Sequence, residues 1–285
     1  MKKLAKLTIG LALVLGLTAC GANESAETKN DGTDKKAQTE TTDTIKIGVV
    51  GEKNEVWEEV IKRYEEGTGK KAELVRFSDY NQPNEALADG DIDVNSFQHH
   101  LFLGQYNEEK GEEILVPIGD TMLAPIGFFS SQIEDIKELE DGAKVAIPND
   151  PTNGPRGIFL LEEAGLIKVE GEPGDLITVD DIVENPKNLE FIEMEASQTA
   201  RALDDVVIAA VNDNYALDAG LSPTDDAILL EDPNGKGTKN YVNVIATRKE
   251  DKDNEVYKEL VEYYQTDETK EDYQTFTNGA WLPAW

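Results

Sequence analysis

Short apolar segments with strand-like patterns alternate with segments of helical periodicity along most of the chain. The first pair is the apolar run at residues 45–50 and the stretch at residues 55–64, where Val56, Val60 and Tyr64 recur at helical spacing. Strands that alternate with helices favour a largely parallel sheet with helices on its faces. The pattern therefore predicts an α/β fold.

The alternation occurs in two series, which predict two lobes, each a mostly parallel sheet flanked by helices. The expected strands are residues 72–77, 92–97, 114–118, 144–147, 189–193 and 206–211, and the expected helices are residues 84–88, 157–164 and 215–219. Two extended apolar segments, residues 122–130 and 241–247, are predicted to cross between the lobes, so that C-terminal helices at about residues 254–277 return to the first lobe. The predicted lobes are residues 44–126 with 243–285, and residues 127–242.

The charge balance and the cysteine count exclude several classes of protein. The chain has 58 acidic and 27 basic side chains and a formal net charge of -31. Because nucleic-acid binding depends on Lys and Arg that neutralise phosphates, no nucleic-acid partner is expected. One cysteine and two histidines cannot supply a disulfide framework or an ordinary structural zinc site. We therefore expect a core held together by packing, with no metal and no cofactor.

The N-terminus has the layout of a secretion signal, with lysines within residues 1–6 followed by an apolar run at residues 7–17 that is too short to span a bilayer. The sequence Leu-Thr-Ala-Cys that ends at Cys20 resembles a bacterial lipobox, which predicts cleavage after residue 19 and a lipid on Cys20. An ordinary signal peptide with an incidental cysteine, and a redox cysteine, are the alternatives. Residues 20–43 lack large apolar side chains and are expected to form a flexible tether. These features predict a lipid-anchored protein on the extracytoplasmic face of the cell membrane.

The motifs that would indicate a metal site or a catalytic site are incomplete or absent. A calcium loop starting at Asp89 would need Gly at position 94 and Glu at position 100, where the chain has Val94 and His100. The chain has no Walker motif, no GxSxG elbow and no HExxH motif. A nucleophile–base pair built on His99 stays an open alternative, although no nucleophile is identified. We therefore expect the protein not to be an enzyme.

Polar and aromatic side chains gather in segments where strands are expected to end, which is where open α/β sheets place ligands. These segments are residues 79–84, 95–102, 148–156 and 211–215. The sequences DYNQPNEALADGDIDVNSFQHH, IPNDPTNGPRGIFLLEEAGLIK, IVENPKNLE and NDNYALDAGL resemble the NlpA/MetQ family of methionine-binding lipoproteins of ABC importers. The similarity runs from about residue 45 to residues 278–280.

The resemblance implies a two-lobed periplasmic-binding-protein-like fold of type 2 with a two-strand hinge. It also implies a monomer that captures free methionine, L-methionine foremost, and delivers it to the permease and ATPase subunits of an ABC importer. The same scaffold could instead bind another amino acid, a methionine derivative or a short peptide. A surface interaction lipoprotein and an enzyme are the remaining alternatives.

The resemblance also implies a set of ligand-binding residues on both lobes. Those on the first lobe are Tyr80, Phe97, His99 and Phe102, and those on the second are Asn153, Arg156 and Asn212. A guanidinium binds a carboxylate in two-point fashion, so Arg156 is expected to hold the ligand carboxylate. The side-chain carbonyls of Asn153 and Asn212 can accept from its ammonium, and a thioether packs well against aromatic rings.

Without the resemblance these residues have plainer interpretations. Arg156 could pair with one of the many acids, Phe97 and Phe102 could belong to the core, and Asn212 could cap a helix. The chain also departs from the family where Gly-Pro precedes Arg156 and where Phe102 stands at a position that is frequently Tyr. His99 could bind the carboxylate or orient a neighbour, and His100 receives no role.

Overall fold

The computed structural model describes residues 44–285. The predicted signal peptide at residues 1–19, the lipidation site Cys20 and the tether at residues 20–43 lie outside the described residues. Within the described part of the chain, no helix combines the length and the apolar character that a membrane crossing requires.

The first sheet has six strands in the order β13-β4-β12-β3-β1-β2. Its strands are β1 (Ile45–Val50), β2 (Ala72–Phe77), β3 (Val94–His99), β4 (Leu115–Leu123), β12 (Val242–Arg248) and β13 (Leu282–Pro283). β1 runs parallel to β2 and β3, whereas β12 and β13 run antiparallel to their neighbours. The α/β class is confirmed, and this sheet is mixed rather than mostly parallel because the strand that returns from the second sheet enters it in the opposite direction.

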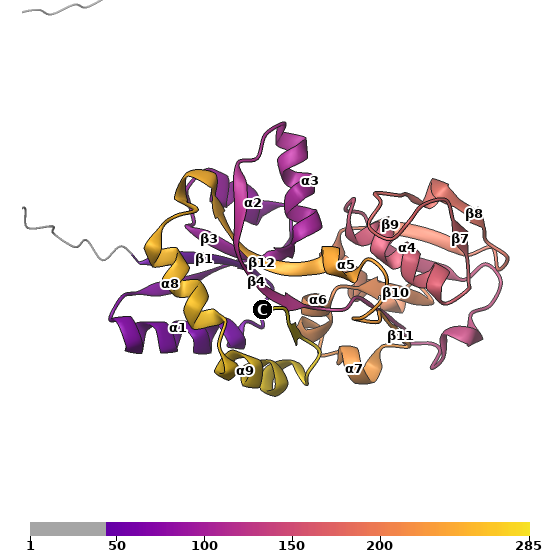
Figure 1. The fold of residues 1–285 in the computed structure, drawn as a ribbon. Helices are drawn as coiled ribbons and strands as arrows, with labels where there is room; N and C mark the ends of the chain where they lie inside the picture. The colour runs from indigo at the N-terminus through magenta and orange to yellow at the C-terminus, as the bar shows by residue number, and fades with distance from the viewer. Residues whose placement is uncertain (1–43) are drawn as a thin grey trace, which may run out of the picture. The chain divides into compact units, whose positions relative to one another are not determined.

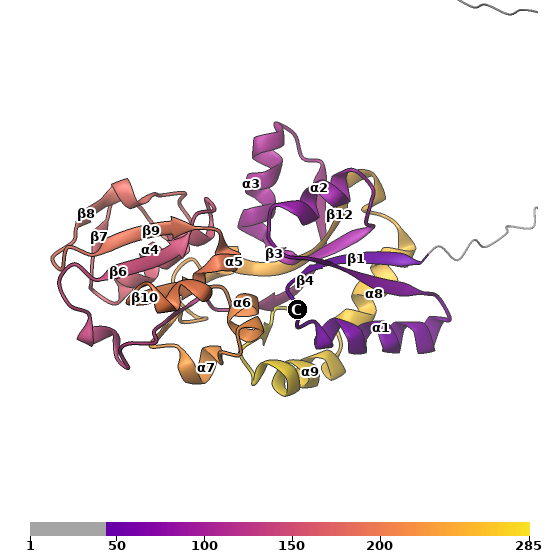
Figure 2. The same ribbon diagram turned by 180° about the vertical axis from the view of Figure 1, so that it is seen from behind.

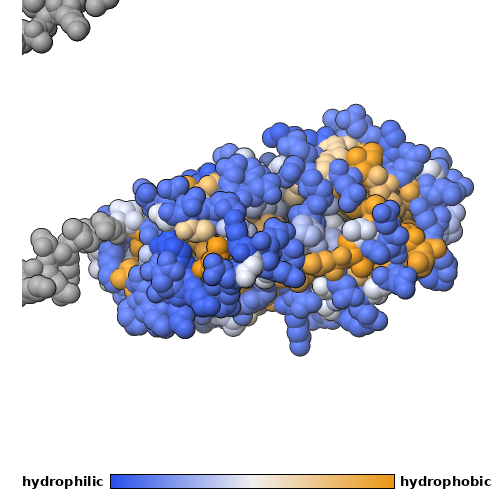
Figure 3. Space-filling view, turned by 90° about the horizontal axis from the view of Figure 1, so that it is seen from above, coloured by the Kyte–Doolittle hydropathy of each residue, from blue (hydrophilic) through white to orange (hydrophobic). Residues whose placement is uncertain are grey.

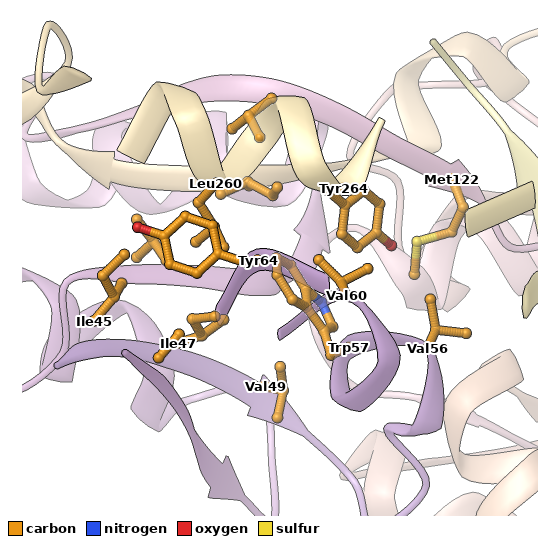
Figure 4. Packing of buried hydrophobic residues seen from close by; sticks show 14 of the residues in the cluster. Ile45, Ile47, Val49, Val56, Trp57, Val60, Tyr64, Met122, Leu260 and Tyr264 are labelled. Carbon is orange, nitrogen blue, oxygen red and sulfur yellow. The ribbon is translucent and has the colours of Figure 1, made fainter. Parts of the chain in front are cut away.

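Helices cover both faces of the first sheet (Figures 1 and 2). Those on one face are α1 (Glu55–Thr68), α8 (Glu255–Tyr264) and α9 (Asp267–Thr277), and those on the other are α2 (Gln82–Ala88) and α3 (His100–Lys110). The predicted helical spacing of Val56, Val60 and Tyr64 is confirmed, because all of them are buried against β1 and α8 (Figure 4). Helix α1 is capped by Gly69, whose φ of 73° is a left-handed conformation that glycine adopts without strain.

The second sheet has five strands in the order β11-β5-β10-β6-β9. Its strands are β5 (Gly127–Phe129), β6 (Lys144–Pro148), β9 (Glu190–Met194), β10 (Ile208–Val211) and β11 (Leu229–Leu230). Helix α4 (Asn153–Glu163) packs on one face, and the short helices α5 (Ala196–Thr199) and α6 (Asp213–Asp218) contribute to the core on the other. The remaining elements are β7 (Lys168–Val169), β8 (Ile182–Glu184), α7 (Pro223–Asp226) and the 3-10 helices η1 (Ile136–Glu138), η2 (Val179–Asp181), η3 (Arg201–Asp204), η4 (Thr238–Tyr241) and η5 (Lys249–Asp251).

The chain passes from the first sheet to the second between β4 and β5, and it returns between β11 and β12. The outward passage lies within residues 122–130, as the sequence predicts. The return lies at residues 231–241, because the segment 241–247 is almost entirely β12 and pairs within the first sheet. On the face drawn in Figure 3 hydrophilic residues predominate, and hydrophobic ones show mainly on the side of the second sheet.

Helix α4 begins at Asn153, before the predicted start at residue 157. The Asp150 carboxylate accepts the backbone N–H of Thr152 at 3.1 Å and of Asn153 at 2.8 Å, which stabilises an earlier first turn. Pro155 lies in that turn, where its missing N–H costs little. The early start matters because it places Asn153 and Arg156 on the same helix.

Candidate ligand-binding site

A cavity lies between the two sheets, at the ends of the strands where the sequence predicts a site. All of the predicted ligand-binding residues line it: Tyr80, Phe97, His99, Phe102, Asn153, Arg156 and Asn212. Phe97 and His99 come from the end of β3, Asn153 and Arg156 from the first turns of α4, and Asn212 from the junction of β10 and α6. His100 is exposed and does not line the cavity, because its Nε2 lies 2.7 Å from Asp120 Oδ1 at the surface.

Three aromatic rings form one wall of the cavity. The ring centroids of Tyr80 and Phe97 are 5.9 Å apart, those of Tyr80 and Phe102 6.1 Å, and those of Phe97 and Phe102 5.8 Å. All three side chains are only half-buried, so each keeps apolar surface for a further contact. The Tyr80 hydroxyl donates to Asn214 Oδ1 at 2.5 Å, which fixes the ring against the second sheet's side of the cavity. The wall offers a ligand polarizable surface with no charge.

His99 is neutral and orients a neighbouring side chain. Its Nδ1 accepts the backbone N–H of Phe102 at 3.1 Å and thereby caps α3, so the ring proton is on Nε2. Nε2 faces Asn153 Oδ1 at 3.4 Å. Burial, with a smaller effect from the Arg156 charge, lowers the pKa of His99 to about 3. His99 thus serves as an uncharged donor over the physiological pH range.

Asn153 and Asn212 differ in the acceptors they leave available. Asn153 Oδ1 accepts from Asn212 Nδ2 at 2.8 Å and from His99, while its Nδ2 donates to the Asp150 carboxylate at 3.1 Å. Asn212 stands at the N-cap position of α6, as the plainer interpretation expects, but its side chain makes no capping bond. Among the described residues, Asn212 Oδ1 is buried without a hydrogen-bond partner. That oxygen is the better acceptor for an incoming donor.

Arg156 is 4% exposed and pairs with a buried acid rather than with a surface one. Its Nε donates to Glu231 Oε1 at 2.9 Å, and its Nη2 donates to Glu231 Oε2 and to the carbonyl of Ala124 at 2.9 Å. The guanidinium also lies over the ring of Tyr241, 4.3 Å from its centroid. Burial works to lower the pKa of Arg156, but the Glu231 carboxylate outweighs it, so the net shift is upward.

The Glu231 contact limits what Arg156 can offer a ligand. The two-point fork expected to hold a ligand carboxylate is already filled by Glu231. Within residues 44–285, Nη1 makes no hydrogen bond, so it is the guanidinium nitrogen of this cavity-lining residue that is still available as a donor. No sequence pattern points to Glu231, because this acid follows a two-residue strand in a segment without a motif.

Further residues line the cavity that no sequence pattern predicts. Asp213, Asn214, Trp57, Tyr264 and Trp281 also line the cavity. Asp213 and Asn214 lie inside the motif NDNYALDAGL, directly after the predicted ligand-binding residue Asn212, and that proximity is the signal that could have identified them. No group of His, Cys, Asp and Glu side chains in the described part of the chain is arranged to hold a metal ion.

Hydrogen bonds connect the two sides of the cavity. Asp218, at the end of α6, accepts the backbone N–H of Glu52 at 2.9 Å and of Lys53 at 2.9 Å. Gly51, with φ of 92°, starts this loop, and a Cβ there would lie 2.6 Å from the Asp218 carboxylate. Asn81 Nδ2 donates to Glu195 Oε2 at 3.1 Å farther out. The structure therefore has the two sides in contact.

Comparisons with known proteins agree with the fold. A family model described as NlpA lipoprotein matches residues 45–285. The chain is 45% identical to the D-methionine-binding lipoprotein MetQ of Escherichia coli strain K12 over 244 residues, which is 85% of this chain and 88% of that protein. It is 39% identical to outer membrane lipoprotein 3 of Mannheimia haemolytica over 99% of this chain and 100% of that protein.

A solved structure of a nutrient-binding protein from Burkholderia cenocepacia, bound to methionine, is similar to this chain with a TM-score of 0.80 and 42% sequence identity. The similarity covers 85% of this chain and 100% of that one. The match of the family model over nearly all of the described residues, together with these identities, shows that the chain belongs to the NlpA lipoprotein family.

Proposed function

We propose that this protein is the substrate-binding component of an ABC importer, which captures free methionine in the cavity between its lobes and delivers it to a membrane permease with its ATPase. One observation carries the proposal: a single cavity brings together an uncharged aromatic wall, a buried guanidinium and an unpartnered amide oxygen. These are the groups that a thioether, a carboxylate and an ammonium require. Relatives named for methionine binding support the choice of ligand.

The proposed ligand pose follows from the groups that remain available. The thioether would lie against Tyr80, Phe97 and Phe102, where sulfur gains from contact with ring edges. The ligand carboxylate would accept a hydrogen bond from Nη1 of Arg156, and the ligand ammonium would donate a hydrogen bond to Asn212 Oδ1. His99 would act through Asn153, whose amide it orients, rather than through the ligand itself.

Capture would be coupled to closure of the lobes, residues 44–126 with 243–285 against residues 127–242. Closure removes the ligand from water and presents one surface built from both lobes to the permease. A lipid on Cys20 would hold the protein as a monomer at the extracytoplasmic face of the membrane, and lipoprotein relatives support that location. The chain is not an enzyme: it belongs to a lipoprotein family whose relatives are named for binding.

Thermal unfolding with a panel of ligands tests this function. L-methionine, D-methionine, methionine sulfoxide, leucine and a methionine dipeptide would each be added to the purified chain. A ligand at about 100 times its Kd stabilises the native state by about 2.7 kcal/mol, which raises the unfolding temperature by several degrees. A shift with methionine that exceeds the shift with leucine supports the proposal. No shift with any ligand would favour a surface interaction lipoprotein, and a larger shift with the dipeptide would favour a peptide receptor.

A further inference from the structure

Of the carboxylates in the described part of the chain, that of Asp213 alone lines the cavity. Asp213 is the first residue of α6 and is 3% exposed. Its Oδ2 accepts from Trp281 Nε1, which comes from the C-terminal segment beside the first sheet. Among the described residues, its Oδ1 is buried and has no hydrogen-bond partner. Half of this carboxylate therefore lacks a donor.

The neighbouring residue has the same deficit. Asn212 Oδ1 is also buried and unpartnered among residues 44–285. Buried acceptors without donors are rare in native proteins, because each loses its bonds to water and gains nothing in return. Two such acceptors, adjacent in sequence and lining one cavity, indicate a place for a group that donates several hydrogen bonds and carries positive charge.

We propose that Asp213 is a specificity-determining residue whose carboxylate is the counter-charge for the ammonium of the ligand, with Asn212 Oδ1 as the second acceptor. The inference rests on the proposed function and adds the residue that distinguishes an amino acid from the corresponding acid without an amine. An alkylammonium has three N–H donors, which suits two orphan oxygens better than a single hydroxyl does.

The charges around the cavity support this assignment. Arg156 from α4 is neutralised by Glu231, and Lys53 enters from the loop before α1. His99 at the end of β3 is neutral, and Asp150 is engaged by Thr152 and Asn153. Burial raises the pKa of Asp213 to about 7, so its charge is sensitive to an added cation. A ligand ammonium would favour the ionised carboxylate and displace a proton to the buffer.

A cycle of two ligands and two proteins tests the assignment by calorimetry. The ligands are L-methionine and 2-hydroxy-4-(methylthio)butanoate, in which a hydroxyl replaces the ammonium. The proteins are the wild type and Asp213→Asn, which keeps an acceptor for Trp281 and loses the charge. We expect Asp213→Asn to weaken L-methionine binding about 10- to 100-fold, as for a charge-assisted hydrogen bond, and to change binding of the hydroxy acid less than about threefold. Asp226→Asn, an exposed acid of α7 outside the cavity, is the matched control and should change neither.

Proton release gives a second readout that a purely structural role would not move. In buffers of different ionisation enthalpy near pH 7, wild type should release a fraction of a proton when it binds L-methionine, and Asp213→Asn should release none. Equal weakening of both ligands, or no weakening of either, overturns the assignment of Asp213 alone. A wild type that binds neither ligand overturns the proposed function and the ammonium site together.

Discussion

Glu231 holds Arg156 by two parallel hydrogen bonds, with Nε on Oε1 at 2.9 Å and Nη2 on Oε2. Both side chains are nearly inaccessible, at 3% and 10% exposure. The carboxylate therefore fixes the orientation of the guanidinium and leaves Nη1 without a hydrogen bond among the described residues. A buried ion pair such as this adds little net stability, but the loss of one partner strands the other charge in a low-dielectric site.

Glu231→Ala should consequently lower the free energy of unfolding by about 3–5 kcal/mol, because it leaves the Arg156 guanidinium buried without its counter-charge. Glu231→Gln should cost less, since one carbonyl oxygen still accepts from the guanidinium. Urea denaturation measures both variants, and Lys62→Ala, which breaks an exposed pair with Glu59, is the control. A loss below about 1 kcal/mol for Glu231→Ala would contradict the buried pairing.

Arg156→Ala should remove most of the affinity for L-methionine, because the ligand carboxylate would lose the guanidinium that faces it. The expected loss is several kcal/mol, or about 100-fold or more in Kd. Calorimetry measures it. Arg76→Ala removes a guanidinium from an exposed pair with Glu58 and should leave the affinity unchanged. Unchanged binding in Arg156→Ala would show that the ligand carboxylate is held elsewhere.

The neutral state of His99 predicts a pH dependence of stability. Its pKa is lowered from 6.5 to about 3 in the folded state, so the unfolded chain binds the proton more readily between these values. The contribution of neutral His99 to the free energy of unfolding is fully present above pH 6.5. It falls by at most about 1.4 kcal/mol per pH unit as the pH drops toward 3. His99→Asn keeps a side-chain acceptor at the cap position of α3 and removes the titration.

The test compares urea denaturation of wild type and His99→Asn at intervals from pH 4 to pH 8. The raised pKa of Asp213 gives an opposite slope, with stability lost as the pH rises from 3.8 toward 7, and this term cancels because both proteins contain Asp213. The difference between the two proteins should therefore grow as the pH rises from 4 to 6.5 and then level off. A difference that is flat across this range would mean that His99 is not held neutral by the fold.

The bonds from Glu52 and Lys53 to Asp218 should bias the protein toward the closed form. Asp218→Ala removes the acceptor of both N–H groups, each of which contributes about 1.5–3 kcal/mol when it bonds to a carboxylate. We expect weaker methionine binding, by about 10-fold, and a larger radius of gyration without ligand in solution X-ray scattering. Asp226→Ala is the matched control. The same radius and Kd in Asp218→Ala would exclude a role in closure.

Much of the fold could be predicted because local patterns determine it. The apolar run of β1 and the spacing of Val56, Val60 and Tyr64 in α1 reflect one buried face each, which a single sequence displays directly. The sequence predicts a later start of α4 than the structure has, because Asn153, Gly154 and Pro155 have no helical periodicity and the first turn is stabilised by Asp150 instead. Side-chain hydrogen bonds of this kind leave no periodic signal.

The candidate site also has a part that local patterns predict and a part that depends on long-range contacts. Its predicted residues lie in motifs at strand ends, which the family resemblance identifies. Glu231 and Trp281 were missed because their partners are far away in sequence: Glu231 lies 75 positions from Arg156, and Trp281 lies 68 positions from Asp213. Such pairings depend on how the chain returns from the second sheet to the first, which no local pattern encodes.

The loop that meets Asp218 has a consequence for how this protein tolerates mutation. Its donors are backbone N–H groups, so the side chains at positions 52 and 53 are free to change while the contact persists, with proline as the exception. At position 218 only a short acceptor can reach both amides. A saturation library should therefore accept most residues at positions 52 and 53 and few at position 218. The contact that closes the cavity would depend on the identity of one residue, and no second position would have to change with it.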